Sequence, residues 1–242
     1  MKIAIIGYGK MGHIVEHIAR ERGHEIVSVI DKENLDDFDS PAFKSADVAI
    51  EFTTPATAVD NYRRAFAAGV PVVSGSTGWT SRRDDVEKMV ADSEASFFWT
   101  SNFSVGVNIF FELSRRLARL MEPFPQYRPF MTETHHIHKL DHPSGTAVTL
   151  ADGIVEESSR INSWTEEVPA ADDALIVNHI REGEVPGTHT IVWDSAVDSI
   201  SITHRAKSRE GFALGAVLAA EWLPGHKGVY GMDALMADLL RG

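Results

Sequence analysis

The sequence contains no cysteine among its 242 residues. This absence excludes thiol catalysis, thiolate-bound zinc, iron–sulfur clusters and structural disulfides. Nothing in the sequence therefore argues for an oxidising compartment, and we expect a cytoplasmic protein.

Long hydrophobic runs are also missing. No segment reaches the roughly 18 uninterrupted apolar residues that a membrane-spanning helix requires. Met1 and Lys2, followed by four apolar residues, resemble the start of a signal peptide, but Gly7 ends the run and a helical pattern with charged residues follows instead of a cleavage site. We expect no association with a membrane.

Positive charge is scarce, since 23 Lys and Arg residues face 35 Asp and Glu residues, which gives a formal net charge of −12. Non-specific binding to nucleic acid requires a clustered positive field, so we expect no nucleic-acid partner. An anionic ligand would have to be bound locally, by backbone N–H groups and a few basic side chains. A hydrophobic share of 43% excludes disorder and suffices for one full core or two small ones.

In the first hundred residues, short apolar runs alternate with helical patterns. The alternation predicts a parallel, doubly wound sheet of Rossmann type. The predicted strands cover residues 3–6, 26–30, 46–52, 70–74 and 95–99, with helices after the first strand and at 56–68 and 80–92.

After a long amphipathic helix that ends before Pro123, the pattern changes. Residues 174–181, 188–193 and 197–206 are β-rich segments without helices between them, which is typical of a mixed or antiparallel sheet. The fold class is therefore α/β, with a second domain of α+β type. Because the last helices are expected to pack back on the first domain, we assign residues 1–105 and 209–242 to one domain and 106–208 to the other.

A glycine-rich loop follows the first strand and opens a helix, which is the context in which G-x-G-x-x-G binds a dinucleotide. Gly7 permits the tight turn, Gly9 lets the backbone approach a pyrophosphate, and Gly12 lets helix and strand pack closely. A glycine turn without a ligand is the alternative. The predicted pyrophosphate loop consists of Gly7, Tyr8, Gly9, Lys10, Met11 and Gly12.

Asp31 lies at the end of the second strand, 19 residues after Gly12, and fits the acid expected to bind the cofactor ribose. The neighbouring Lys32 could pair with a 2′-phosphate or simply be solvated. The pair leaves the choice between NADH and NADPH open, and we expect the protein to use both.

A second turn, Gly75-Ser76-Thr77-Gly78, follows the fourth strand at the edge where open α/β sheets bind ligands. Gly75, Ser76 and Thr77 are candidates to line the nicotinamide ribose. The alternative is a turn that only caps the next helix.

The most informative stretch runs from Glu133 to Ala147 and reads E-T-H-H-I-H-K-L-D-H-P-S-G-T-A. It combines proton donors with a Ser-Gly-Thr turn at a helix start, where anions bind. A metal site is a weaker interpretation, because no H-E-x-x-H helix is present, and we expect no metal ion. A solvated basic loop is the third possibility. We favour acid–base catalysis on a carboxylated substrate.

This stretch closely resembles the E-x-H-H-x-x-K-x-D-x-P-S-G-T-A signature of the 4-hydroxy-tetrahydrodipicolinate reductase family, also called dihydrodipicolinate reductases. The resemblance extends over essentially the whole chain, including Asn102 to Asn108, Gly187 to Thr190 and Thr203 to Ala206. It implies a homotetrameric enzyme of lysine biosynthesis that uses NADH or NADPH to reduce a cyclic dicarboxylate. A cofactor domain and a domain for substrate binding and oligomerisation are implied as well.

The resemblance also implies roles for individual residues. His135 would act as proton donor and acceptor, and Lys139 as the second proton donor. The substrate contacts would be His136, Ser144, Gly145 and Thr146. The nicotinamide end of the cofactor would lie against the backbone of Gly75, Ser76, Thr77, Thr100, Ser101, Asn102 and Phe103.

Three positions depart from the family pattern. The glycine loop is one residue shorter than the form G-x-x-G-x-M-G, Ser76 stands where threonine is usual, and the span from Lys32 to Ser45 is short. Two rival functions remain: another two-domain reductase, such as an amino-acid or semialdehyde dehydrogenase, and a nucleotide-sensing protein without turnover. The histidine-rich stretch favours a 4-hydroxy-tetrahydrodipicolinate reductase over both of these rival functions.

An exposed apolar face on the second sheet would explain oligomerisation, since open sheet edges and apolar faces need cover. The residues predicted to form this face are Ile176, Ile180, Ile191, Trp193, Ile200 and Ile202.

Overall fold

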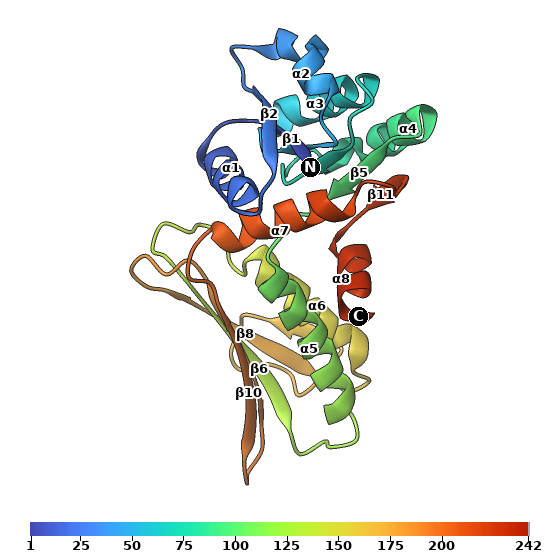
Figure 1. Cartoon of the computed structure of the whole chain (residues 1–242). Coiled ribbons are helices and arrows are strands. Elements are labelled where there is room, and N and C mark those ends of the chain that lie inside the picture. The colour runs from blue at the N-terminus through green and yellow to red at the C-terminus, as the bar shows by residue number, and fades with distance from the viewer. Residues whose placement is uncertain (242) are drawn as a thin grey trace. The chain divides into compact units, whose positions relative to one another are not determined.

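The computed structural model describes residues 1–241 and divides into two compact units. The first unit joins residues 1–105 to the segment that begins at Glu210, and the second spans Gly106–Arg209. Gly242, the last residue of the range predicted for the first domain, lies outside the described residues. Figure 1 traces both units in chain order.

The first unit is built on a six-stranded sheet in which every pair of neighbouring strands is parallel. Its order is β11-β5-β4-β3-β1-β2, so the chain winds outward in both directions from the centre, which is the doubly wound arrangement. The strands are β1 (Lys2–Ile6), β2 (Glu25–Ile30), β3 (Val48–Glu51), β4 (Val72–Ser74), β5 (Ser96–Trp99) and β11 (Gly228–Tyr230).

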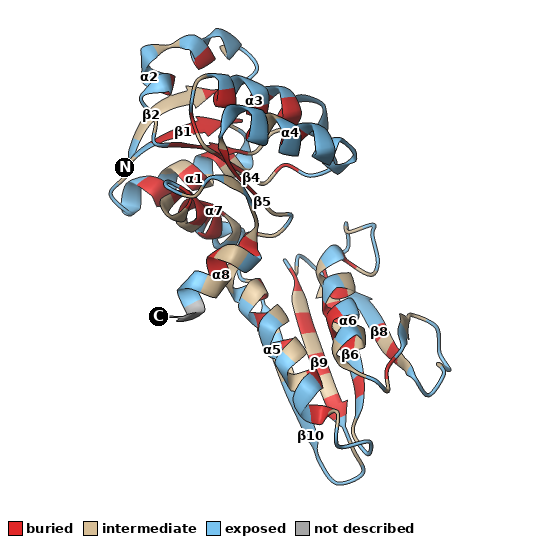
Figure 2. Cartoon of the chain, turned by 90° about the vertical axis from the view of Figure 1, so that its right-hand side faces the viewer, coloured by how far each residue is buried: buried red, intermediate tan, exposed pale blue. Residues whose placement is uncertain are grey.

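Helices cover both faces of this sheet (Figure 2). Ile3 and Ile5 point to the face covered by α1 (Lys10–Glu21), α7 (Glu210–Trp222) and α8 (Met232–Arg241). Ala4 and Ile6 point to the face covered by α2 (Pro41–Lys44), α3 (Pro55–Ala67) and α4 (Arg83–Ser93). Two covered faces explain why the strands read as continuous apolar runs. Two short 3-10 helices, η1 (Leu35–Asp39) and η2 (Thr80–Arg82), complete the unit.

The second unit contains a mixed five-stranded sheet with the order β10-β9-β6-β8-β7. Its strands are β6 (Arg128–His135), β7 (Ser163–Thr165), β8 (Ala174–Arg181), β9 (Thr188–Asp194) and β10 (Ser199–Arg205). β6, β7 and β8 run parallel, whereas β9 and β10 are antiparallel to their neighbours. The helices α5 (Val105–Met121) and α6 (Gly145–Glu157) pack on one face, against Met131, Leu175, Val177, Ile191 and Trp193.

The face predicted for oligomerisation was wrong for four of its six residues. Ile191 and Trp193 are fully buried beneath α5 and α6. Ile202 pairs with Ile191 and Ile200 with Trp193, so these two lie on the same covered face. Successive side chains of a strand point to opposite faces of the sheet. The sequence of one strand therefore does not show which of its side chains share a face with those of the neighbouring strand. The uncovered face carries the other two predicted residues, Ile176 and Ile180, together with Phe130 and Val192.

The predicted fold class is confirmed: a parallel sheet with helices on both faces, and a mixed second sheet. The three-residue strands β7 and β11 were missed, because so short a run carries no periodic signal. Within the described residues, no helix has the length and apolar character to cross a membrane.

Candidate active site

The glycine loop joins β1 to α1 and has the close contacts that only glycine permits. Gly7 has a φ of +91°, and a Cβ there would overlap the carbonyl oxygen of Phe52. A Cβ on Gly12 would overlap the carbonyl oxygen of Gly7. At Gly9, in contrast, no atom lies within 4 Å of the Cβ position. The backbone is therefore open to a ligand at Gly9.

The start of α1 fits the pyrophosphate of a dinucleotide. Gly9 is the N-cap and offers no side chain to the first turn, so the N–H groups at the helix start remain without a side-chain cap. Lys10 is exposed and Met11 is half-buried at this end. The Tyr8 hydroxyl donates to Glu16, which directs that side chain along the helix. Open space beside uncapped amides is the arrangement that an anionic group needs.

Asp31 directly follows β2, beside the end of β1. Its backbone N–H donates to the side-chain oxygen of Asn34 at 2.7 Å, and its Oδ1 accepts from the N–H of Lys32 at 2.9 Å. The Lys32 ammonium lies 3.3 Å from Glu33, and 81% of its side chain is exposed. A 2′-phosphate at Lys32 would therefore have to compete with Glu33.

Ser76 is buried and all of its polar groups are bound within the protein. Its hydroxyl donates to Oε1 of Glu51 at 2.9 Å and accepts the N–H of Thr53 at 2.8 Å. Its carbonyl oxygen accepts the indole N–H groups of Trp79 and Trp99, at 2.9 and 2.8 Å. Ser76 therefore holds the turn in place. Gly75 and Thr77 remain the residues of this turn that can contact the nicotinamide ribose.

Glu51 ends β3 and is completely buried. Burial raises the pKa of its carboxyl group, an effect that the hydrogen bonds from Ser74, Thr53 and Ser76 only partly offset. The same hydrogen bonds tie the loops after β3 and β4 to each other.

The segment between β5 and α5 contains the other residues predicted for the nicotinamide end. Thr100 donates its N–H to the carbonyl oxygen of Ser74 at 3.4 Å and accepts the N–H of Asn102 at 3.1 Å. Phe103 is buried and its ring lies 5.9 Å from that of Phe98. Ser101 is exposed. The first unit thus gathers these loops at the carboxyl ends of its parallel strands, where such sheets bind ligands.

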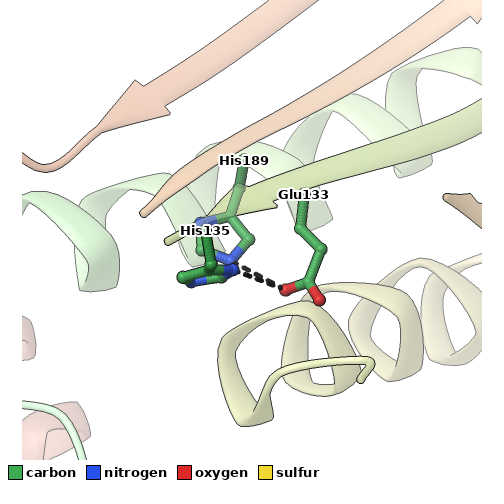
Figure 3. Close-up of side chains that lie close together, drawn as sticks. All are labelled: Glu133, His135 and His189. Carbon is green, nitrogen blue, oxygen red and sulfur yellow. Dashed lines mark ion pairs between the residues drawn. The ribbon is translucent and has the colours of Figure 1, made fainter. Parts of the chain in front are cut away.

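In the second unit, two neighbouring histidines face one buried carboxylate (Figure 3). Glu133 and His135 come from β6, and His189 lies opposite Glu133 on β9. One oxygen, Oε2 of Glu133, is 3.3 Å from Nδ1 of His135 and 3.6 Å from Nε2 of His189. The distance to His135 is that of an ion pair, but the N–H is not aligned as a hydrogen-bond donor.

Glu133 is kept anionic by its surroundings. Burial alone would raise its pKa, but interactions with His135, His189 and Ser144 outweigh burial and hold the pKa far below its usual range. Nη2 of Arg181 lies 3.5 Å away and adds a positive charge. Burial lowers the pKa of His189, which favours a neutral ring. A fixed negative charge therefore lies next to His135.

Lys139 lies on the loop that leads from β6 to α6. Its ammonium contacts both carboxylate oxygens of Asp141 at 2.8 Å, and this ion pair lowers the pKa of Asp141. Arg181 donates to the backbone oxygens of Lys139 and Asp141, at 3.2 and 2.7 Å. His136, at the start of the loop, is half-buried. Arg181 thus fixes the backbone of the loop.

The start of α6 has one buried and two more open residues. Ser144 donates its N–H to Glu133 at 3.1 Å, and its hydroxyl accepts the N–H of Ala147 at 3.2 Å as the helix cap. Gly145 is exposed, with no atom within 4 Å of a Cβ position, and Thr146 is half-buried. An anion at this helix start would therefore meet Gly145 and Thr146, while Ser144 supports the turn from inside.

Sequence reasoning assigned no role to Glu133, Arg181, His189 or Glu51. Glu133 opens the signature motif, and the alternation E-T-H places it on the same face as His135, which was a usable signal. Arg181 pairs in register with His135 across β6 and β8, a relationship that no local pattern shows.

Comparisons with known proteins bear on the whole chain. The family models for the N-terminus and the C-terminus of dihydrodipicolinate reductase match residues 1–103 and 106–236. The chain belongs to the dihydrodipicolinate reductase family. The 4-hydroxy-tetrahydrodipicolinate reductase of Christiangramia forsetii is 43% identical over 241 residues, with all of both chains covered. The reductase of Archaeoglobus fulgidus is 34% identical and covers 96% of this chain and 98% of its own.

Solved structures agree on the fold. A dipicolinate-bound dihydrodipicolinate reductase from Paenisporosarcina sp. TG-14 superposes with a TM-score of 0.75 at 22% identity, covering 97% of this chain and 98% of its own. An engineered D-amino acid dehydrogenase bound to NADP+ reaches only 0.53 at 13% identity, covering 96% and 92%. The resemblance to this family that the sequence showed is therefore confirmed. The reductase function and the nicotinamide cofactor, both predicted from the sequence, are confirmed with it.

Proposed function

We propose that this protein catalyses the reduction of 4-hydroxy-tetrahydrodipicolinate to tetrahydrodipicolinate by NADH or NADPH, with release of water, on the route to diaminopimelate and lysine. The observation that carries the proposal is the set of contacts around Glu133, which joins the proposed acid–base residue His135 to the anion-binding start of α6.

In this proposal, residues 1–105 and 209–242 form the cofactor domain. The start of α1 and Gly9 would hold the pyrophosphate, Asp31 and Lys32 the adenosine ribose, and Gly75, Thr77 and residues 100–103 the nicotinamide end. When bound, the cofactor supplies the two electrons of the reduction. A buried Ser76 keeps the nicotinamide turn in one conformation.

Residues 106–208 would bind the substrate and move the protons. Reduction of a conjugated imine leaves an electron-rich enamine, which must take up a proton. Lys139 is the proposed donor at Nζ, and a substrate carboxylate would replace Asp141 as its partner. The conjugated imine forms when the substrate loses its hydroxyl group and a proton from the neighbouring carbon as water. His135, next to the fixed charge of Glu133, would take up that proton and return it to the departing hydroxyl.

Two anionic groups of the substrate need positive partners. The helix start at Gly145 and Thr146 offers backbone N–H groups and the positive end of the α6 dipole. His136 would contact the same ligand from the loop. Ser144, predicted as a contact, would act through the cap and through Glu133 instead.

We also propose a cytoplasmic homotetramer. The uncovered face of the second sheet carries the apolar side chains Phe130, Ile176, Ile180 and Val192 among threonines and serines. A second copy would remove this surface from water. Light scattering that gives a monomer at micromolar concentration would refute the tetramer without affecting the reaction.

A coupled assay tests the reaction itself. The product of dihydrodipicolinate synthase is supplied as substrate, and the loss of nicotinamide absorbance is recorded with NADH and with NADPH. Oxidation of either cofactor only in the presence of that product supports the proposal. Oxidation with amino-acid or semialdehyde substrates alone would favour the rival dehydrogenases, and binding of the cofactor without turnover would favour a sensing protein.

A further inference from the structure

A second group of histidines lies outside the proposed active site. The sequence motif led us to expect no metal ion, but from the side-chain geometry we propose that His142, Glu166 and His179 form a binding site for one zinc ion or a similar transition-metal ion. His142 belongs to the loop before α6, Glu166 directly follows β7, and His179 lies on β8. They are far apart in the sequence, so no spacing motif reveals them. Neither histidine has a role in the proposed reaction.

The donor atoms already converge. Nδ1 of His142 lies 3.0 Å and Nδ1 of His179 lies 2.9 Å from the same oxygen, Oε1 of Glu166. The two imidazole rings stack 4.2 Å apart at an interplanar angle of 17°. Zinc ligands at about 2.0–2.2 Å from the metal stand about 3–3.5 Å from one another. The three donor atoms are thus close enough for one ion, and the two rings would have to turn out of their stack so that the in-plane lone pair of each Nδ1 points at it.

The chemistry of the three ligands suits a borderline metal. Two imidazoles and one carboxylate are typical of zinc and of its first-row neighbours, rather than of magnesium or calcium. The side chains of His142, Glu166 and His179 are 50%, 26% and 38% exposed, so an ion can enter and water can complete its coordination.

The group Glu133, His135 and His189 also brings three ligand atoms together, and among the described residues it is the other such group. It is a poorer metal site. Its carboxylate already accepts the N–H of Ser144 and faces Arg181, whose positive charge repels a cation. The burial of all three side chains removes the water that an entering ion would keep.

A metal ion at the proposed site would connect three segments. His142 lies three residues after Lys139 and two before Ser144, so it is part of the loop that carries the proposed proton donor. Coordination would attach this loop to β8 and to the end of β7. We therefore expect the ion to stabilise the folded chain, because it binds the folded state and not the unfolded one.

The test uses the full chain without a histidine tag, and without substrate or cofactor. Calorimetric titration with Zn²⁺ should give one ion per chain, and Co²⁺ should produce a visible absorption band from coordination by nitrogen and oxygen. His179→Ala and Glu166→Ala should each weaken Zn²⁺ binding by at least about tenfold. Zn²⁺ should raise the melting temperature of the unmodified chain and not that of His179→Ala.

His138→Ala is the matched control. His138 and Glu184 form an exposed pair at 3.3 Å in the same unit. The ring of His136 lies 6.0 Å from that of His138, and among the described residues the pair belongs to no group of three converging ligand atoms. This variant should bind Zn²⁺ as tightly as the unmodified chain. Circular dichroism of the metal-free variants establishes that each is folded. If His179→Ala and His138→Ala bind Zn²⁺ equally well, or if no ion binds to the unmodified chain, the proposal is wrong. Neither result changes the reductase proposal, because no reaction is measured.

Discussion

Oε1 of Glu133 lies 3.1 Å from the backbone nitrogen of Ser144. This hydrogen bond joins a buried position on β6 to the residue that caps α6, eleven positions later in the chain. The loop that carries Lys139 is therefore closed at its base by a charged acceptor. The two ends of the signature motif form one structural unit, with a carboxylate at its centre.

Replacing this carboxylate should weaken both stability and turnover. Glu133→Gln keeps the size of the side chain but removes the charge that faces Arg181 and the two histidines. We expect a loss of roughly 1–3 kcal/mol in the free energy of unfolding, measured in urea, and a lower kcat. Glu184→Gln, at a carboxylate that is 80% exposed, is the control and should change neither. Unfolding of Glu133→Gln at the same urea concentration as the unmodified chain would contradict this account.

Stability should fall as the pH is lowered below the ordinary pKa of histidine. Burial lowers the pKa of His189 in the folded chain from its ordinary value of 6.5. Below that value the unfolded chain binds a proton at this residue and the folded chain does not, so acid favours unfolding. His189→Gln should therefore lose less stability than the unmodified chain between about pH 7 and pH 5.5, before the carboxylates titrate.

His17→Gln is the control for this comparison, because His17 is 68% exposed. Its pH dependence should match that of the unmodified chain. Urea unfolding at the two pH values measures all three proteins. If the free energy of unfolding of His189→Gln falls with pH as steeply as that of the unmodified chain, His189 is not the group responsible for the loss of stability in acid.

Lys32 should affect one cofactor more than the other. Asp31 accepts from a ribose hydroxyl but repels a 2′-phosphate, whereas Lys32 attracts that phosphate, so both cofactors should be used within about a tenfold preference. Lys32→Ala should raise the KM for NADPH several-fold and leave the KM for NADH unchanged. Lys88→Ala, an exposed lysine on α4, should change neither. If Lys32→Ala and the unmodified chain have the same KM for NADPH, Lys32 does not contact the 2′-phosphate.

Much of the fold could be predicted because its strands are buried on both faces. Runs such as residues 3–6 and 70–74 are apolar without interruption and lie between helical patterns, which leaves few alternatives to a parallel sheet. For the second sheet, the sequence predicted three of the strands but not which side chains point to the helices and which to the uncovered face. Which side Ile191 and Ile202 occupy depends on register and on where α5 and α6 pack, and both are tertiary properties.

The site was predictable as far as its residues lie within one motif. His135, Lys139 and the start of α6 are neighbours in the sequence, whereas Arg181 and His189 reach Glu133 from other strands. The sequence also does not distinguish a ligand contact from an internal support. Ser76 and Ser144 occupy motif positions, yet both are buried with their polar groups bound inside the protein. Burial, which no motif reports, separates the two roles.

The most direct test of the account compares single-turnover and steady-state rates of His135→Ala and Lys139→Ala with those of the unmodified enzyme. If each side chain acts in proton transfer, turnover should fall by about 10²–10⁴-fold. Cofactor binding, measured separately by nicotinamide fluorescence, should be unchanged, because the glycine loop and Asp31 belong to the other unit. Near-normal turnover in both variants would contradict the assignment of acid–base chemistry to this motif.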